Sequence, residues 1–408
     1  MNRYVLIGAL LVVVAVAVVV LLAFQNQPAP LAAQPSVGKM YVYTVRIGDQ
    51  QVGTAYFIAL KEGVVYGDVR NESLTYILFR ESHINVLARG PRGEIQKSTY
   101  YSKPLGLCIN STTSLTIAGE QVTLSNSQCR TSYTPLPTAR SFEDAVFLVV
   151  GLPPPASWTR AGVAQTPFGQ AVVYVNTTTV PIFPGLNAVL NYEKQQLPDG
   201  AVYMLKVQLT YGTQPAATLT YVLQKAAEMA PEVRQAVAEL MQNVTAAVGG
   251  GLDVLRVAEK IGMSYDGGWP AAVIFFDLDC PYCAQLFRYN YTLFQGHKVV
   301  LIDLVVHEAA LPDHQRLRCL YQKSPQSVVP TLLEIYARFL AGDRNYTDIL
   351  PTESCTVDVQ SSRRLAEILA GQAGESVGTP MVAVIYPNGT YTVIVGYNPA
   401  AISKALRG

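Results

Sequence analysis

Hydrophobic and polar residues alternate along much of this 408-residue chain, but one run near its start is apolar throughout. Residues 4–24 contain no charged side chain, and as a helix they would span about 30 Å, the thickness of a bilayer's hydrocarbon core. The run is longer than the apolar part of a cleavable signal peptide. We therefore favour an uncleaved transmembrane signal-anchor over the alternative of a signal peptide that is removed, with residues 25–38 as a flexible stalk. Arg3 before the run places the N-terminus in the cytoplasm and the rest of the chain outside.

Residues 39–225 follow a different pattern, in which short segments rich in Val, Tyr and Thr alternate with turn residues. This pattern predicts an antiparallel β-rich domain. One helix is predicted at 142–150, because Ser141 and Asp144 have the spacing of a capping box. The strands are expected at residues 40–47, 52–60, 63–69, 73–80, 113–118, 169–176, 201–211 and 216–224.

Residues 226–265 have the pattern of a helical linker. Pro231 suits the first turn of a helix, and apolar residues recur after it at helical spacing. Three glycines at 249–251 interrupt this helix before a second one at 252–261. Two interpretations remain open: a hinge, or a helical pair packed on the C-terminal domain.

The amino-acid composition argues against a disordered chain and against a nucleic-acid-binding protein. Half of the residues are hydrophobic and only 14% are charged, whereas a typical soluble chain has about 25% charged residues. High hydrophobicity excludes a disordered chain. A formal net charge of +1 without a basic cluster argues against nucleic acid as a partner.

Asparagines supply an independent sign of location. Seven of them begin an N-x-[ST] sequon, whereas chance predicts roughly two. The excess favours an N-glycosylated protein outside the cytoplasm. The candidates are Asn71, Asn110, Asn176, Asn243, Asn290, Asn345 and Asn388.

Cysteine spacing separates the chain's six cysteines into groups. Cys108 and Cys129 bracket 20 residues of strand-and-turn sequence, which is consistent with a disulfide across a hairpin. Cys319 and Cys355 flank a helical stretch. Six cysteines allow 15 pairings, so spacing alone does not fix the connectivity.

The remaining two cysteines form Cys280-Pro-Tyr-Cys283, directly after an apolar run at 271–276 that predicts a buried strand. Residues 284–294 have helical character, which places Cys280 at a helix N-terminus, where the helix dipole stabilises a thiolate. Cys280 is therefore the predicted nucleophile of a redox pair, and Cys283 the thiol that resolves the mixed disulfide.

Two other interpretations of the pair are a plain structural disulfide and half of a zinc site. Zinc needs two further ligands, and no histidines form a paired motif. The chain's histidines are His83, His297, His307 and His314. We predict no metal and no cofactor.

Residues 268–408 resemble the thioredoxin-fold domain of the DsbC/DsbG-type thiol–disulfide isomerases and oxidoreductases. The resemblance covers about a third of the chain. It rests on five segments: Phe275–Cys283, Arg318–Tyr321, Cys355 in a helical insertion, Gly378-Thr379-Pro380 before a strand, and Gly389 to Pro399.

This resemblance implies that Pro380 is a cis-proline packed against the cysteine pair, with Thr379 before it, and that this loop binds an extended substrate peptide. Pro281 and Tyr282 complete the expected substrate-binding set. The resemblance also implies a structural disulfide between Cys319 and Cys355.

The sequence departs from the family in two respects. Ile274 stands where thioredoxins carry a buried acid, so proton transfer to Cys283 would rely on water, Asp277 or Asp279. The β-rich residues 39–225 have no recognised counterpart. A helix at 226–248 could replace the family's linker, and a homodimer is a possible assembly.

The predicted fold class is α+β: an N-terminal transmembrane helix, a β-rich antiparallel domain, a helical linker and a C-terminal thioredoxin-like domain with a helical insertion. The predicted boundaries are 1–38 for anchor and stalk, 39–225 for the β-rich domain, 226–265 for the linker and 266–408 for the redox domain.

The predicted function is a single-pass, membrane-anchored thiol–disulfide oxidoreductase whose C-terminal ectodomain faces away from the cytoplasm. Isomerase or reductase activity is favoured, because Pro-Tyr between the cysteines lacks the cationic His of strong oxidants. Its expected partners are disulfide-containing or unfolded secreted proteins and a membrane thiol-redox protein that resets the pair. The alternative is a non-catalytic binding or chaperone-like protein that uses the thioredoxin fold as a scaffold.

Overall fold

The chain divides into two compact units, which we call the first and second unit. The computed structural model describes residues 35–408 except 71, 104–105, 132–135, 184–185, 212–213 and 246–248. The first unit contains residues 1–111 and 127–245, and the second contains residues 112–126 and 246–408.

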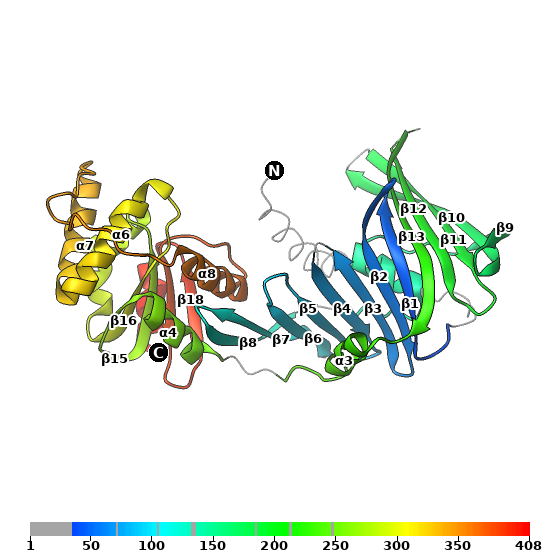
Figure 1. Ribbon diagram of the computed structural model, residues 1–408, viewed down its shortest axis with the longest axis horizontal. Helices are drawn as coiled ribbons and strands as arrows, with labels where there is room; N and C mark the ends of the chain where they lie inside the picture. The colour runs from blue at the N-terminus through cyan, green and yellow to red at the C-terminus, as the bar shows by residue number, and fades with distance from the viewer. Residues whose placement is uncertain are drawn as a thin grey trace. The chain divides into compact units, whose positions relative to one another are not determined.

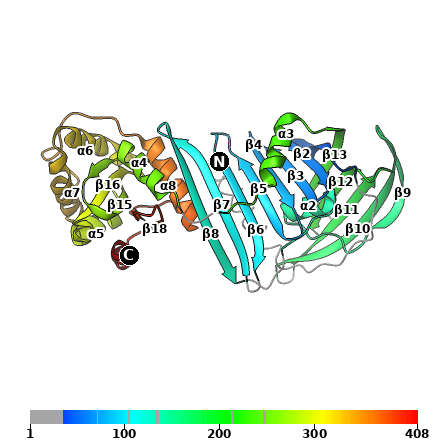
Figure 2. The same cartoon turned by 90° about the horizontal axis from the view of Figure 1, so that it is seen from below.

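One antiparallel sheet of thirteen strands dominates the fold, in the order β8-β7-β6-β5-β4-β3-β2-β1-β13-β12-β11-β10-β9 (Figure 1). Neighbours in the sheet are neighbours in sequence except at β1 and β13, so two meanders join side by side. Figure 2 shows β5 to β8 following one another in order. The strands are β1 (Lys39–Ile47), β2 (Gln50–Leu60), β3 (Gly63–Arg70), β4 (Ser73–Phe79), β5 (His83–Arg89), β6 (Ile95–Lys103), β7 (Gly106–Ile117), β8 (Glu120–Thr131), β9 (Thr159–Thr166), β10 (Gly169–Phe183), β11 (Leu186–Gln196), β12 (Val202–Tyr211) and β13 (Gln214–Glu228).

Among the described residues of the first unit, helices α2 and α3 cover this sheet. Helix α2 (Phe142–Val150) starts at a capping box formed by Ser141 and Asp144, and its Phe142 ring stacks on Tyr43 with centroids 4.0 Å apart. A buried ion pair joins α2 to β11, with Lys194 Nζ 2.7 Å from Glu143 Oε1. Helix α3 (Pro231–Leu240) packs against β1 to β5 and forms with them a separate apolar cluster that includes Met40.

The second unit contains a five-stranded sheet in the order β14-β16-β15-β17-β18, with β15 and β16 parallel and the other pairs antiparallel. Its strands are β14 (Met263–Tyr265), β15 (Gly268–Phe276), β16 (His297–Asp303), β17 (Met381–Ile385) and β18 (Tyr391–Val395). Its helices are α4 (Gly251–Ile261), α5 (Pro281–Asn290), α6 (Leu311–Lys323), α7 (Pro325–Leu340), α8 (Val359–Ala373) and α9 (Pro399–Arg407), with 3₁₀ turns η1 (Tyr291–Phe294) and η2 (Glu308–Ala310).

Both faces of this smaller sheet are covered by helices. Along β15, Ala272, Ile274 and Phe276 face a cluster built with α5, α7 and α9, while the alternate residues face α4 and α8. Because a strand buried on both faces needs apolar residues at consecutive positions, its sequence is a continuous apolar run, as at 271–276.

The tip of the β7–β8 hairpin, residues 112–126, belongs to the second unit. Four of its side chains pack in the cluster with α4 and α8: Leu115, Ile117, Val122 and Leu124. Gly249 exchanges two backbone hydrogen bonds with Ser125 (3.0 and 3.1 Å). Gly250 has φ +97°, and a Cβ there would lie 2.1 Å from the Thr123 carbonyl oxygen. These glycines thus permit a close approach of backbone to backbone.

The predicted fold class is wrong. The described chain is mostly β, with 45% of residues in strands and the thirteen-stranded antiparallel sheet as its main element, rather than α+β. The alternation of hydrophobic and polar residues did not predict strands β5, β6, β8, β9 and β11. Those strands carry many polar residues; β9, for example, reads Thr-Arg-Ala-Gly-Val-Ala-Gln-Thr and lies largely exposed at a sheet edge.

The transmembrane helix in the predicted fold class also has no support. Within the described ranges, no helix combines the length and the apolar character needed to cross a membrane. The predicted anchor, residues 4–24, lies outside the described residues.

Candidate functional site

The cysteine pair lies where β15 gives way to α5. The buried strand ends at Phe276, a three-residue loop follows, and Cys280 is the N-cap of the helix that Pro281 begins. Both cysteines are free thiols, and both are buried. A Pro at the first helical position costs no hydrogen bond, because amides of the first turn have no partner within the helix.

The surroundings of Cys280 favour the ionised form of its thiol. Its Sγ accepts a hydrogen bond from the Cys283 backbone N–H at 3.4 Å and lies 3.2 Å from the Thr379 carbonyl oxygen. The hydrogen bond from the Cys283 side chain lowers the pKa of Cys280 to about 6, although burial acts in the opposite direction. Cys280 is therefore mostly thiolate at neutral pH.

Cys283 has the opposite character. Its side chain is fully buried, and burial raises the pKa of its thiol well above the ordinary value, with the neighbouring Cys280 adding to the effect. The two thiols thus differ as an attacking thiolate and a protonated resolving thiol do.

The loop before β17 lies against the pair. The Thr379–Pro380 peptide bond is cis, and Pro380 is buried while Thr379 is half-buried. Pro281 and Tyr282 lie exposed at the start of α5. The structure therefore brings Thr379 to the Cys280 sulfur across almost 100 residues of sequence. A second cis peptide, Trp269–Pro270, was not anticipated from the sequence.

Asp277, which we considered as a proton donor to Cys283, has both carboxylate oxygens occupied. Its Oδ2 accepts the backbone N–H groups of Val306 (2.6 Å) and His307 (2.7 Å), and its Oδ1 accepts that of Asp279 (2.8 Å). Asp279 itself pairs with Arg344 at 2.7 Å. Both acids therefore hold loops in place around the pair.

A buried charged cluster, which the sequence did not reveal, fixes the loop between β15 and α5. His314 Nε2 accepts a hydrogen bond from the Leu278 backbone N–H at 3.1 Å, so the imidazole proton resides on Nδ1. Nδ1 lies 2.7 Å from Asp303 Oδ1, to which it donates. Arg318 pairs with the other oxygen of Asp303. Burial pushes the pKa of Asp303 upward, but Arg318 and His314 outweigh it and hold that pKa below its ordinary value. The only available signal was the i, i+4 spacing of His314 and Arg318, which places them on one helix face.

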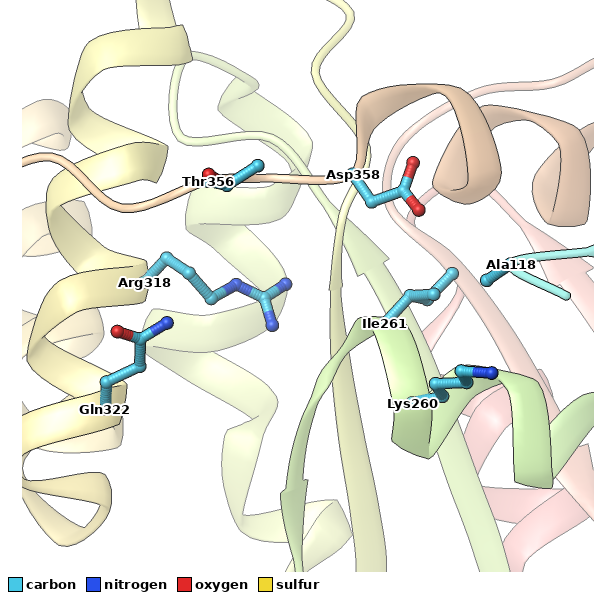
Figure 3. Close-up of a pocket in the computed structure, with 7 residues that line it drawn as sticks. All are labelled: Ala118, Lys260, Ile261, Arg318, Gln322, Thr356 and Asp358. Carbon is cyan, nitrogen blue, oxygen red and sulfur yellow. The ribbon is translucent and has the colours of Figure 1, made fainter.

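A cavity of about 310 Å³ lies beside Arg318 in the second unit (Figure 3). Its lining residues are Ala118, Lys260, Ile261, Arg318, Gln322, Thr356 and Asp358. Neither cysteine of the pair lines it, so this cavity is separate from the candidate site.

Other residues singled out in the sequence have clear positions. Cys108 is joined to Cys129 (S–S 2.00 Å), and Cys319 to Cys355 (S–S 2.04 Å). Asn71 lies outside the described residues, whereas the other six sequon asparagines are described.

No protein-family model and no curated protein matches the sequence. The solved structures that are similar to it include these three. Chlamydia trachomatis DsbA has 13% identity, with 36% of this chain and 89% of that chain covered, at a TM-score of 0.26. Oxidised BdbD from Bacillus subtilis has 16% identity, with 36% and 95% covered, at 0.23. Helicobacter pylori DsbG has 11% identity, with 52% and 94% covered, at 0.23.

All three similar proteins are thiol–disulfide oxidoreductases of the thioredoxin fold. They do not single out the DsbC/DsbG type, which stays a prediction. Because the TM-scores are low, we base the functional proposal on the geometry of the cysteine pair.

Proposed function

We propose that the protein is a thiol–disulfide oxidoreductase that acts through Cys280 and Cys283. The observation that carries the proposal is the contrast between the two thiols. Cys280, at the N-terminus of α5, has its pKa lowered to about 6, while the pKa of buried Cys283 is raised. Such a contrast is the one that exchange chemistry needs.

The proposed reaction begins with attack of the Cys280 thiolate on one sulfur of a substrate disulfide. The substrate S–S bond breaks, its second sulfur leaves as a thiolate, and a mixed disulfide forms. Cys283 then loses its proton and attacks the Cys280 sulfur, which releases the substrate as a dithiol and leaves Cys280–Cys283 oxidised. Two electrons pass from the pair to the substrate, and the reverse sequence donates a disulfide.

Thr379 and Pro380 are the proposed contact for an extended substrate peptide, with Pro281 and Tyr282 beside them. The nearness of the Thr379 carbonyl to Cys280 Sγ supports this placement, because a backbone group there would align a bound strand with the reacting sulfur. The proposed substrates are disulfide-containing or unfolded proteins outside the cytoplasm, where the disulfides Cys108–Cys129 and Cys319–Cys355 would persist. A thiol-redox partner would reset the pair for reductase or isomerase turnover.

Insulin reduction by dithiothreitol tests the proposal. The wild-type protein should accelerate it and Cys280→Ser should not. Reduced Cys283→Ser, mixed with insulin after the dithiothreitol is removed, should accumulate a mixed disulfide visible as a mass adduct. Both variants replace sulfur by oxygen at one atom, and unchanged hydrogen exchange in β15 would show that they remain folded. Turnover that survives Cys280→Ser would refute the catalytic proposal and favour a binding protein built on the same fold. Refolding of a scrambled-disulfide protein then separates isomerase from reductase.

A further inference from the structure

The sequon asparagines differ in what the fold does with their side-chain amides. In glycosylation the Nδ2 atom must be accessible, because it becomes bonded to the sugar. A side chain whose Nδ2 already donates a hydrogen bond inside the protein has to break that bond first, and a partly buried one has to open the structure around it.

Asn345 and Asn388 present their amides in the same way. Asn345 is exposed in the loop after α7, and its Oδ1 accepts the Thr347 hydroxyl at 2.7 Å and the Thr347 backbone N–H at 3.2 Å. Asn388 is exposed in the β17–β18 turn, and its Oδ1 accepts the Thr390 hydroxyl at 2.7 Å and backbone N–H at 3.0 Å.

In both sequons the hydroxyl residue therefore contacts the amide that would be modified. With Oδ1 turned to its own backbone, Nδ2 is on the opposite side of the amide. Among the described residues, neither Nδ2 has a hydrogen-bond acceptor.

Asn110 and Asn290 present the contrary case. Asn110 Nδ2 donates to the Val244 carbonyl oxygen at 3.0 Å, and its Oδ1 accepts the Ser127 hydroxyl at 2.8 Å. Asn290 Nδ2 donates to the Tyr397 hydroxyl at 2.8 Å. Both side chains are half-buried.

We propose that Asn345 and Asn388 are N-glycosylation sites of the folded protein, and that Asn110 and Asn290 are not. The donor is a lipid-phosphate-linked oligosaccharide, supplied with its transferase outside the cytoplasm. Nδ2 bonds to the anomeric carbon of the sugar, the bond from that carbon to the phosphate oxygen breaks, and the phosphate leaves with the electron pair. The amide nitrogen gives up one proton to the solvent, and nothing is oxidised or reduced. Modification at these asparagines does not depend on the redox chemistry of the cysteine pair.

The test uses a purified single-subunit oligosaccharyltransferase of N-x-[ST] specificity and its lipid-linked donor. Its competence is first established on four synthetic peptides, each carrying one of these sequons. The folded full chain is then treated, and site occupancy is read by glycopeptide mass spectrometry. Relative to its own peptide, each of Asn345 and Asn388 should be modified at least about tenfold more than Asn110 or Asn290, since each of the latter must break an internal hydrogen bond.

Matched variants separate the sequon from the fold. Thr347→Ala should abolish modification of Asn345 and leave Asn388 unchanged, while Thr347→Ser should retain both. The proposal is overturned if the folded chain is not modified at Asn345 and Asn388 although the peptides are, or if Asn110 or Asn290 is modified as readily as they are.

Discussion

The acidity of Cys280 is the property of this site that can be measured most directly. With a pKa of about 6, this thiol is about 90% ionised at pH 7, against about 3% for an ordinary cysteine of pKa near 8.5. That advantage of about 30-fold is offset by the weaker nucleophilicity of an acidic thiolate, which is roughly 13-fold lower for a Brønsted slope near 0.45. The net gain is only about 2- to 3-fold at pH 7 but about 20-fold at pH 5.5. The midpoint, rather than the rate at neutral pH, is therefore the diagnostic quantity.

The assay is alkylation of the reduced protein by iodoacetamide from about pH 4.5 to about pH 9, a range that includes both the lowered and the ordinary cysteine pKa, with the Cys280 peptide quantified by mass spectrometry. The structure also supplies a matched pair of variants, since the side-chain hydrogen bond from Cys283 is the main cause of the lowered pKa. Cys283→Ala removes that donor and should move the midpoint upward, while Cys283→Ser retains a donor and should remain near wild type. A wild-type midpoint near 8.5, or equal midpoints in the two variants, would refute the reasoning.

The same shift makes the stability of the reduced protein depend on pH. A thiol whose folded-state pKa is lowered stabilises the fold fully above its unfolded pKa, and this contribution disappears as pH falls through the folded value. Between about pH 6 and 7.5, Cys283 stays largely protonated in both the folded and the unfolded state, so of the two thiols Cys280 dominates the pH dependence. The reduced protein should therefore become more stable across this window as pH rises.

Three further predictions concern buried side chains, and hydrogen-exchange mass spectrometry can read each unit separately. Asp303→Asn leaves Arg318 without its carboxylate and should destabilise the second unit by about 3–5 kcal/mol; unchanged exchange in β15 would contradict this. Leu124→Ala creates a cavity beneath α4 and α8 and should cost about 2–5 kcal/mol, with protection lost in α4 and not in β12. Glu143→Gln leaves Lys194 buried without its partner and should cost the first unit about 3–5 kcal/mol, whereas an unaltered α2 would show that the pair contributes nothing.

Local sequence was sufficient to place the cysteine pair. The apolar run before Cys280 and the helical pattern after Cys283 agree with β15 and α5, because both are set by burial and capping of neighbouring residues. The position of Thr379 against Cys280 depends on pairing between distant segments, and the sequence offered it only through a family resemblance.

The buried charged cluster was not evident from the sequence. Asp303, His314 and Arg318 look like surface residues, yet all three are buried together, because each neutralises or hydrogen-bonds another. The strands that the sequence did not predict are the opposite case, because polar residues occupy positions inside regular elements. Strand β9, for example, has mostly exposed, polar side chains, so its hydrophobic periodicity is weak. Its backbone hydrogen bonds to β10 hold it in the sheet instead.

The hairpin tip at 112–126 has a consequence for the order of events during synthesis. Its apolar side chains leave the ribosome more than 120 residues before α4, since the residues that cover them begin only at 251. The nascent chain must therefore keep Leu115, Ile117, Val122 and Leu124 from associating elsewhere while the rest of the first unit is translated. The second unit includes this hairpin tip as well as residues 246–408, so its assembly is a long-range event that awaits nearly the whole polypeptide.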